Sequence, residues 1–204
     1  MKIAIIDYGM GNIHSVSKAI ELCGAKPLVT GKKAQLDSCE KVVLPGVGAF
    51  DDAMAELEKL GLVSAVKKQV ESGKPFLGIC LGMQLLFESS QEAKSKAGLG
   101  FLKGQVVKFS ASLGQKIPHM GWNNLEYISG SCALLKGIKA NEQVYFCHSY
   151  YPEASDKNIV AATCDYGLEF ACAVAKDNIY GVQFHPEKSQ SVGLKIIRNF
   201  VESC

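Results

Sequence analysis

The chain has 204 residues, of which 48% are hydrophobic, and its formal net charge is +2 at pH 7. This length can bury one substantial core, and the nearly balanced charge predicts no general attraction to nucleic acid or to membranes. No apolar run approaches the length of a membrane span and no charged leader opens the sequence, so we expect a cytoplasmic protein.

The first part of the chain predicts strands that alternate with helices. Apolar runs predict strands at residues 2–7, 27–29 and 41–44, and a helix over residues 13–23 separates the first two strands. Gly-Met-Gly at residues 9–11 follows the first strand, but His14 stands where a dinucleotide-binding loop has its third glycine. We interpret this turn as a tight loop at the carboxyl edge of a sheet, near a site or facing a partner.

A segment of alternating glycines follows the third predicted strand. Glycines in Pro45-Gly46-Val47-Gly48 allow the backbone to approach a ligand closely and to expose main-chain N–H groups. The N–H of Val47 or Gly48 is therefore a candidate donor to an oxyanion. Taken alone, an ordinary strand-to-helix turn explains the same residues.

Cys80 lies where a predicted strand gives way to a predicted helix. The pattern predicts helices between residues 49 and 72, a strand at 76–79 and a helix at 81–89. Gly-Ile-Cys-Leu-Gly at residues 78–82 is then a nucleophile elbow with sulfur in place of oxygen, and the following helix favours the thiolate. The Leu81 N–H would face an oxyanion. By itself, the pentapeptide is also compatible with a small buried thiol.

The second half of the chain is rich in strands. They are predicted at residues 104–109, 125–128, 143–148, 159–164, 170–175 and 179–184, before a closing helix at 191–202. The last strand runs into His185-Pro186-Glu187. A cysteine nucleophile needs an imidazole to move its proton, and the imidazole needs an anion on its other nitrogen. In an extended segment, the spacing of His185 and Glu187 places both side chains on one side, although a plain strand-ending turn could also read this way.

These elements together predict an α/β fold. We expect a mostly parallel central sheet flanked by helices, with an antiparallel β extension that leads back into it, all within a single domain at residues 1–204. Cys80 and His185 each follow a predicted strand, so both are expected at the carboxyl edge of the sheet, where reactive groups gather in such folds.

The cysteines and histidines predict neither disulfides nor a metal site. Eight cysteines lack CxxC spacing and lie mostly in apolar runs, which favours free thiols in a reducing compartment. The four histidines, His14, His119, His148 and His185, have no ligand-like spacing. We therefore expect no metal and no cofactor.

Over nearly its whole length the chain resembles the class I, triad-type glutamine amidotransferases. Five segments carry the resemblance: Asp-Tyr-Gly-Met-Gly-Asn at 7–12, Leu-Pro-Gly-Val-Gly at 44–48, Gly-Ile-Cys-Leu-Gly-Met-Gln at 78–84, Pro-His-Met-Gly-Trp-Asn at 118–123 and His-Pro-Glu-Lys-Ser at 185–189. Cys-Leu-Gly and His-Pro-Glu are shared across the class. The first and fourth segments are more discriminating and resemble the glutaminase subunits of histidine biosynthesis.

The resemblance implies that the substrate is L-glutamine. Cys80 would attack its side-chain amide, His185 would protonate the departing ammonia, and water would hydrolyse a γ-glutamyl thioester, with Glu187 orienting the histidine. The family pattern also implies substrate contacts from the side chains of Gln84 and Glu92 and from the main chain of Gly46, Ser149 and Tyr150.

The resemblance further implies an obligatory partner, because free ammonia would protonate and escape into water. The implied partner is a (βα)8-barrel cyclase subunit in a heterodimer. Asn12, Trp122, Tyr145 and Lys188 match positions of the partner-facing surface. A single tryptophan can equally be a core residue.

Three alternatives stay open at this point. A paralogous glutaminase could feed ammonia to another synthase, for example one that installs an amidino group on a sugar. A redox-sensing or chaperone-like protein can carry an elbow cysteine, although it would not need His185-Pro186-Glu187. A catalytically dead interaction subunit is disfavoured because all three catalytic residue types are present.

Overall fold

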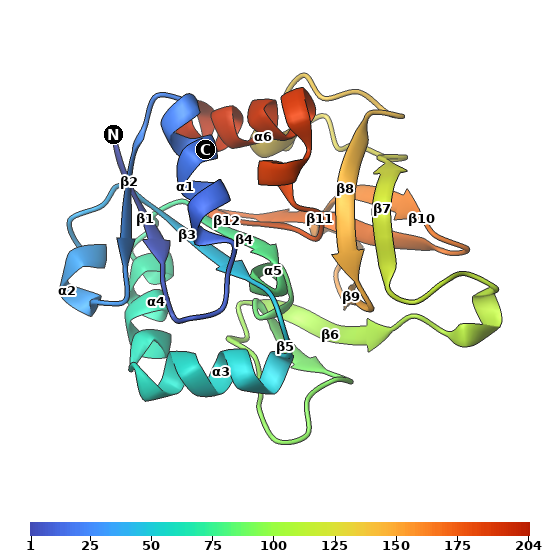
Figure 1. Ribbon diagram of the computed structural model, residues 1–204, viewed down its shortest axis with the longest axis horizontal. Helices are drawn as coiled ribbons and strands as arrows, with labels where there is room; N and C mark the ends of the chain where they lie inside the picture. Colours follow the sequence, from blue (N-terminus) through green and yellow to red (C-terminus); the bar gives the residue numbers. More distant parts are fainter.

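A seven-stranded sheet forms the centre of the protein in the computed structural model, which describes residues 1–204 (Figure 1). The strand order is β10-β11-β12-β4-β3-β1-β2; the strands from β2 to β12 pair in parallel, and β11 and β10 continue the sheet antiparallel. The predicted α/β class, with an antiparallel extension joined to the main sheet, is thus confirmed. The strands are β1 Lys2–Ile6, β2 Lys26–Thr30, β3 Lys41–Gly46, β4 Phe76–Cys80, β10 Val160–Asp165, β11 Glu169–Lys176 and β12 Ile179–Val182.

Helices cover both faces of this sheet, as Figure 1 shows. One face packs against α1, Ile13–Leu22, and α6, Gln190–Ser203, through buried side chains such as Ile20 and Phe200. The other face packs against α3, α4 and α5 through residues such as Leu57. Those helices are α3 Phe50–Lys59, α4 Leu62–Glu71 and α5 Leu81–Gln84. The short helix α2, Lys33–Leu36, was not predicted, and its Leu36 belongs to the same core. No helix is both long and apolar enough to cross a bilayer.

Two smaller sheets stand beside the carboxyl edge of the main sheet. One contains β5 Phe87–Ser90, β6 Leu102–Lys108 and β9 Tyr150–Ala154; the other pairs β7, His119–Asn124, with β8, Gln143–His148. In the second sheet His119 lies directly opposite His148. The single turn residue between β8 and β9, Ser149, therefore joins the two small sheets.

Three sequence predictions were wrong in detail. The helix predicted at 81–89 ends at Gln84, because the Leu85 and Leu86 carbonyls accept hydrogen bonds from the N–H groups of Leu99 and Leu102 and lead the chain into β5. The strand predicted at 125–128 is absent apart from one bridge at Ile128, and the unpredicted strand β7 precedes it. β3 extends through Pro45 and Gly46, beyond the predicted end at residue 44.

Candidate active site

Cys80 occupies a sharp turn between β4 and α5, as the elbow motif predicts. Its φ is +54° and its ψ is −113°, a region that costs free energy for any residue other than glycine. The flanking glycines make room for the turn: a Cβ on Gly82 would lie 1.8 Å from the Leu44 carbonyl oxygen, and one on Gly78 would lie 2.6 Å from the Gly82 carbonyl oxygen. The elbow therefore holds Cys80 by backbone packing that tolerates no larger residue beside it.

His185 and Glu187 face each other just beyond β12. His185 Nδ1 lies 2.9 Å from Glu187 Oε1, and both side chains are buried. The segment is not extended as predicted, because Pro186–Lys188 forms a 3₁₀ turn; proline at its first position is preorganised for such a turn. Asn12 Nδ2 donates a hydrogen bond of 3.1 Å to the same Glu187 oxygen, while Glu187 Oε2 is buried without a partner.

The surroundings of His185 favour its protonated form. Burial alone would lower its pKa, but the interactions with Cys80 and Glu187 raise the pKa above the ordinary histidine value. A buried carboxylate next to the imidazole thus stabilises an imidazolium beside the thiol, which is the charge arrangement that cysteine nucleophiles use.

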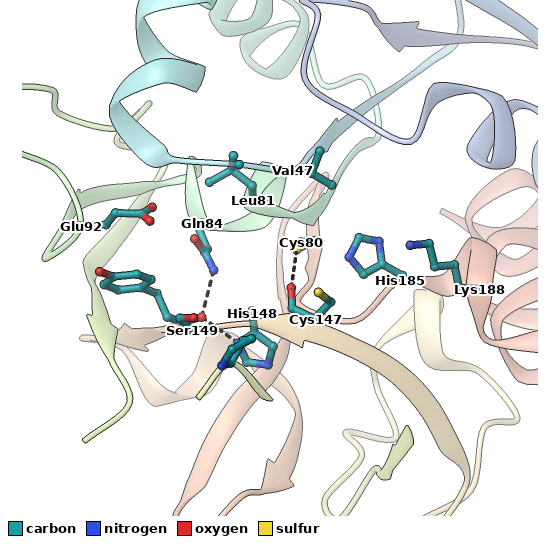
Figure 2. A pocket seen from close by; sticks show the side chains of 13 residues that line it. Val47, Cys80, Leu81, Gln84, Glu92, Cys147, His148, Ser149, His185 and Lys188 are labelled. Atoms are coloured by element: carbon teal, nitrogen blue, oxygen red, sulfur yellow. Dashed lines mark hydrogen bonds between the residues drawn. The ribbon is translucent and has the colours of Figure 1, made fainter. Parts of the chain in front are cut away.

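The elbow and the histidine open into one pocket of about 300 Å³ (Figure 2). It brings together most of the predicted site residues: Val47, Gly48, Cys80, Leu81, Gln84, Glu92, Ser149, Tyr150, His185 and Lys188. Pro118, Cys147 and His148 also line it and were missed, as was Gln183, whose Nε2 lies 3.7 Å from Cys80 Sγ. Most of these missed residues could have been predicted only by knowing that β7 pairs with β8.

Gly46, which was predicted to contact the substrate, does not line the pocket, because Tyr8 Oη and the Gly82 main chain pack directly against it.

Two polar side chains define the end of the pocket away from His185, as Figure 2 shows. Gln84 donates both amide hydrogens, to the Tyr150 carbonyl at 3.0 Å and to Gln183 Oε1 at 3.0 Å, so its own oxygen remains free to accept. Glu92 Oε2 accepts a hydrogen bond of 2.9 Å from the Phe50 N–H at the start of α3. Its other oxygen, Oε1, takes no part in that bond and can accept one from a ligand. The pair offers two acceptors of the kind that an ammonium group needs.

The glycine-rich segment after β3 forms the rim above Cys80. Val47 and Gly48 are exposed, and Gly48 has a φ of +100°, which favours glycine at this position. Tyr8, which the sequence did not single out, anchors the segment because its hydroxyl donates to the Pro45 carbonyl at 3.0 Å. Burial, and then the proximity of Cys80, raises the pKa of Tyr8, so the hydroxyl stays a donor.

Three of the four predicted partner-facing residues form one surface cluster. Trp122 is 44% exposed and stacks edge-on against Tyr145, with ring centroids 6.1 Å apart, and Lys188 Nζ lies 5.6 Å from the Tyr145 ring centre. The exposure of Trp122 argues against the alternative of a core aromatic. Asn12 instead bonds to Glu187, so it connects the loop after β1 to the histidine turn.

Beneath this cluster lies a buried histidine pair that predicts acid sensitivity. Burial lowers the pKa of His119 to about 4 and that of His148 to about 3, from an ordinary 6.5. Below pH 6.5 the unfolded chain therefore binds protons that the folded chain excludes, so the free energy of unfolding is retained above this pH and falls as the pH drops towards 4. Each pKa unit by which folding lowers a histidine pKa is worth about 1.4 kcal/mol, so we expect the free energy of unfolding, measured with urea, to fall by several kcal/mol across this pH range.

In a His119→Gln variant, the free energy of unfolding should depend less steeply on pH. An unchanged dependence would contradict a role for the buried histidine pair in acid sensitivity.

The sequence matches the family described as "Glutamine amidotransferase class-I" over residues 4–204. Among curated proteins, it is 50% identical over 201 residues to "Imidazole glycerol phosphate synthase subunit HisH" of Aquifex aeolicus, covering 98% of this chain and 96% of that protein. It is 49% identical over 200 residues to the protein of the same name from Thermosynechococcus vestitus, covering 98% and 95%.

A solved structure has a similar fold. The "Structure of PurLQS from Thermotoga maritima" contains a chain that superposes with a TM-score of 0.79 at 20% identity, covering 98% of this chain and 97% of that one. The chain therefore belongs to the class I glutamine amidotransferases and, within them, to the family of imidazole glycerol phosphate synthase subunit HisH.

Proposed function

We propose that this chain, acting as one glutaminase domain over residues 1–204, hydrolyses glutamine to glutamate and ammonia through Cys80, His185 and Glu187. The observation that carries the proposal is the convergence of a strained elbow thiol and a buried imidazole–carboxylate pair on one pocket. Membership of an enzyme family sets aside the redox-sensor alternative.

In the proposed mechanism each group has a distinct role. Cys80 attacks the side-chain amide carbon of glutamine, and the N–H groups of Leu81 and of the segment at Val47 or Gly48 stabilise the oxyanion. His185 protonates the leaving ammonia and then activates the water that hydrolyses the γ-glutamyl thioester. Glu187 holds the imidazole in one orientation and stabilises its charged form.

The substrate backbone fits the other end of the pocket. The free oxygens of Gln84 and Glu92 accept the glutamine ammonium, and the main chain of Ser149 and Tyr150 borders the same space. Gly46 contributes indirectly, by allowing the strand to pass close under the elbow.

We further propose that the ammonia passes to a (βα)8-barrel cyclase subunit that docks over the cluster of Trp122, Tyr145 and Lys188. This cyclase makes imidazole glycerol phosphate and AICAR in histidine biosynthesis. Lys188 belongs both to the cluster and to the pocket lining, so the surface cluster adjoins the site of ammonia release. The names of the relatives support this pairing, because each is a subunit of imidazole glycerol phosphate synthase.

The experiment that tests the proposal measures glutamate release by the chain alone, by the chain with the cyclase, and by both together with the cyclase ligand. That ligand is the ribulosyl aminoimidazole carboxamide nucleotide to which the cyclase adds ammonia. We expect release that depends on the cyclase and rises with its ligand. Glutamate release that does not change when the cyclase is bound would contradict this pairing and would favour a paralogue that supplies ammonia to another synthase.

Replacing Glu187 by glutamine is expected to lower kcat about a hundredfold with little change in KM, because the charge that stabilises the imidazolium is lost. Steady-state glutamate release by the complex measures this effect. Glu71→Gln, a charge change of the same kind on an exposed position of α4, is the matched control. An unchanged kcat in the Glu187 variant would remove this carboxylate from the mechanism.

A further inference from the structure

A continuous series of hydrogen bonds links the strand that carries Trp122 to the Cys80 thiol. It begins at β7, where His119 Nδ1 lies 3.0 Å from His148 Nε2 on β8. It continues from His148 Nδ1 to the Tyr150 carbonyl at 2.8 Å. Both rings are buried, and His148 also lines the substrate pocket, where the mechanism above gives it no task.

The bonding partners fix the tautomer of each ring. The Tyr150 carbonyl can only accept, so His148 Nδ1 carries the hydrogen and, in a neutral ring, Nε2 is an acceptor. His119 must then donate from Nδ1, which leaves its Nε2 to accept from Asn123 Nδ2 at 3.3 Å. Asn123 uses the same nitrogen to donate to the Asp165 carbonyl at 2.8 Å, so the orientation of its amide is also fixed.

The far end of the series reaches the reacting groups. The Tyr150 carbonyl accepts from His148 and from Gln84 Nε2, and Gln84 also donates to Gln183 Oε1. Gln183 Nε2 then points to Cys80 Sγ. The turn after β8 is thus held from one side by an imidazole N–H and from the other by the side chain that the substrate ammonium is expected to meet.

We propose that His148 is a positioning residue for glutamine binding, and that His119 keeps it in the required tautomer. By donating from Nδ1 to the Tyr150 carbonyl, His148 fixes the Ser149–Tyr150 main chain and, through it, the orientation of Gln84. The inference rests on the proposed glutaminase function and adds to it a residue outside the triad.

Two substitutions at His148 separate the two bonds of the ring. In His148→Asn, the amide nitrogen occupies the place of Nδ1, so the donor to Tyr150 is kept and the acceptor for His119 is lost. In His148→Gln, the amide oxygen occupies the place of Nε2, so the acceptor is kept and the donor is lost. A purely structural role would make the smaller asparagine the more damaging replacement.

Glutamate release by the complex with the cyclase and its ligand measures the difference. We expect KM for glutamine to rise about five- to tenfold in His148→Gln, with a smaller change in kcat, and to stay within about twofold in His148→Asn. Equal KM values in the two variants, or a rise confined to the asparagine variant, would overturn the inference. If the unaltered complex releases no glutamate, the proposed function fails instead.

The tautomers can be read in the unaltered protein, which keeps the inference testable if either variant fails to fold. Imidazole ¹⁵N shifts measured in the complex are expected to show both His119 and His148 as neutral rings with the hydrogen on Nδ1 at pH 6.5. A hydrogen on Nε2 of His148, or a protonated ring there, would contradict the proposed bond to Tyr150.

Discussion

Replacement of Cys80 by alanine is expected to lower glutamate release by at least about a thousandfold while the protein stays folded and still binds the cyclase. The reason is that no other thiol in the pocket is held as a nucleophile: Cys147 is close, with its carbonyl oxygen 3.9 Å from Cys80 Sγ, but it lies within strand β8 and does not follow a strand-to-helix turn. Glutamate release by the ligand-stimulated complex is the measurement.

Cys39→Ala provides the matched control for this substitution. Cys39 is a buried free thiol that belongs to the core on the α3 and α4 side of the sheet, outside the pocket. The control should retain activity, because it loses a thiol of similar burial without touching the site. Substantial release by the Cys80 variant would show that the pocket hydrolyses glutamine without a covalent intermediate.

Replacement of Gly82 by alanine is expected to destabilise the protein by about 3 kcal/mol or more and to remove most of the activity. The new Cβ would lie 1.8 Å from the Leu44 carbonyl oxygen. That oxygen belongs to the central strand β3 and cannot move aside like the end of a side chain, so α5 must shift and carry the elbow with it. Urea unfolding and glutamate release measure the two effects.

Gly130→Ala is the corresponding control, because a Cβ at Gly130 meets nothing within 4 Å. Its stability should stay within about 0.5 kcal/mol of the unaltered protein. A Gly82 variant of normal stability and activity would mean that the elbow tolerates displacement and that close packing against β3 is not what positions Cys80.

The sequence predicts the catalytic centre well because its signals are local. Gly78 and Gly82 flank a cysteine between an apolar strand and a helix, and the turn chemistry alone indicates the elbow. His185-Pro186-Glu187 likewise contains its own base and carboxylate, and the structure brings them to 2.9 Å even though the turn is 3₁₀ rather than extended. Local patterns of this kind do not depend on which strands pair.

The features that the sequence did not predict depend on contacts between distant segments. β7 has no β-branched residue and is a strand only because it pairs with β8; that pairing is also what brings His119 to His148. The helix at 81–89 stops at Gln84 because a later segment takes over the backbone bonding. Propensity is outweighed in both places by tertiary pairing, which a single sequence does not reveal.

A γ-glutamyl thioester at Cys80 is the central intermediate of the proposed reaction. Acid quenching of the complex during glutamine turnover, followed by peptide mass spectrometry, tests it. We expect the peptide that contains Cys80 to carry the added mass of one γ-glutamyl group, and that addition to be absent from the Cys80→Ala protein. An active complex that carries the addition on another residue, or none under conditions in which hydrolysis is slowed, would contradict the account.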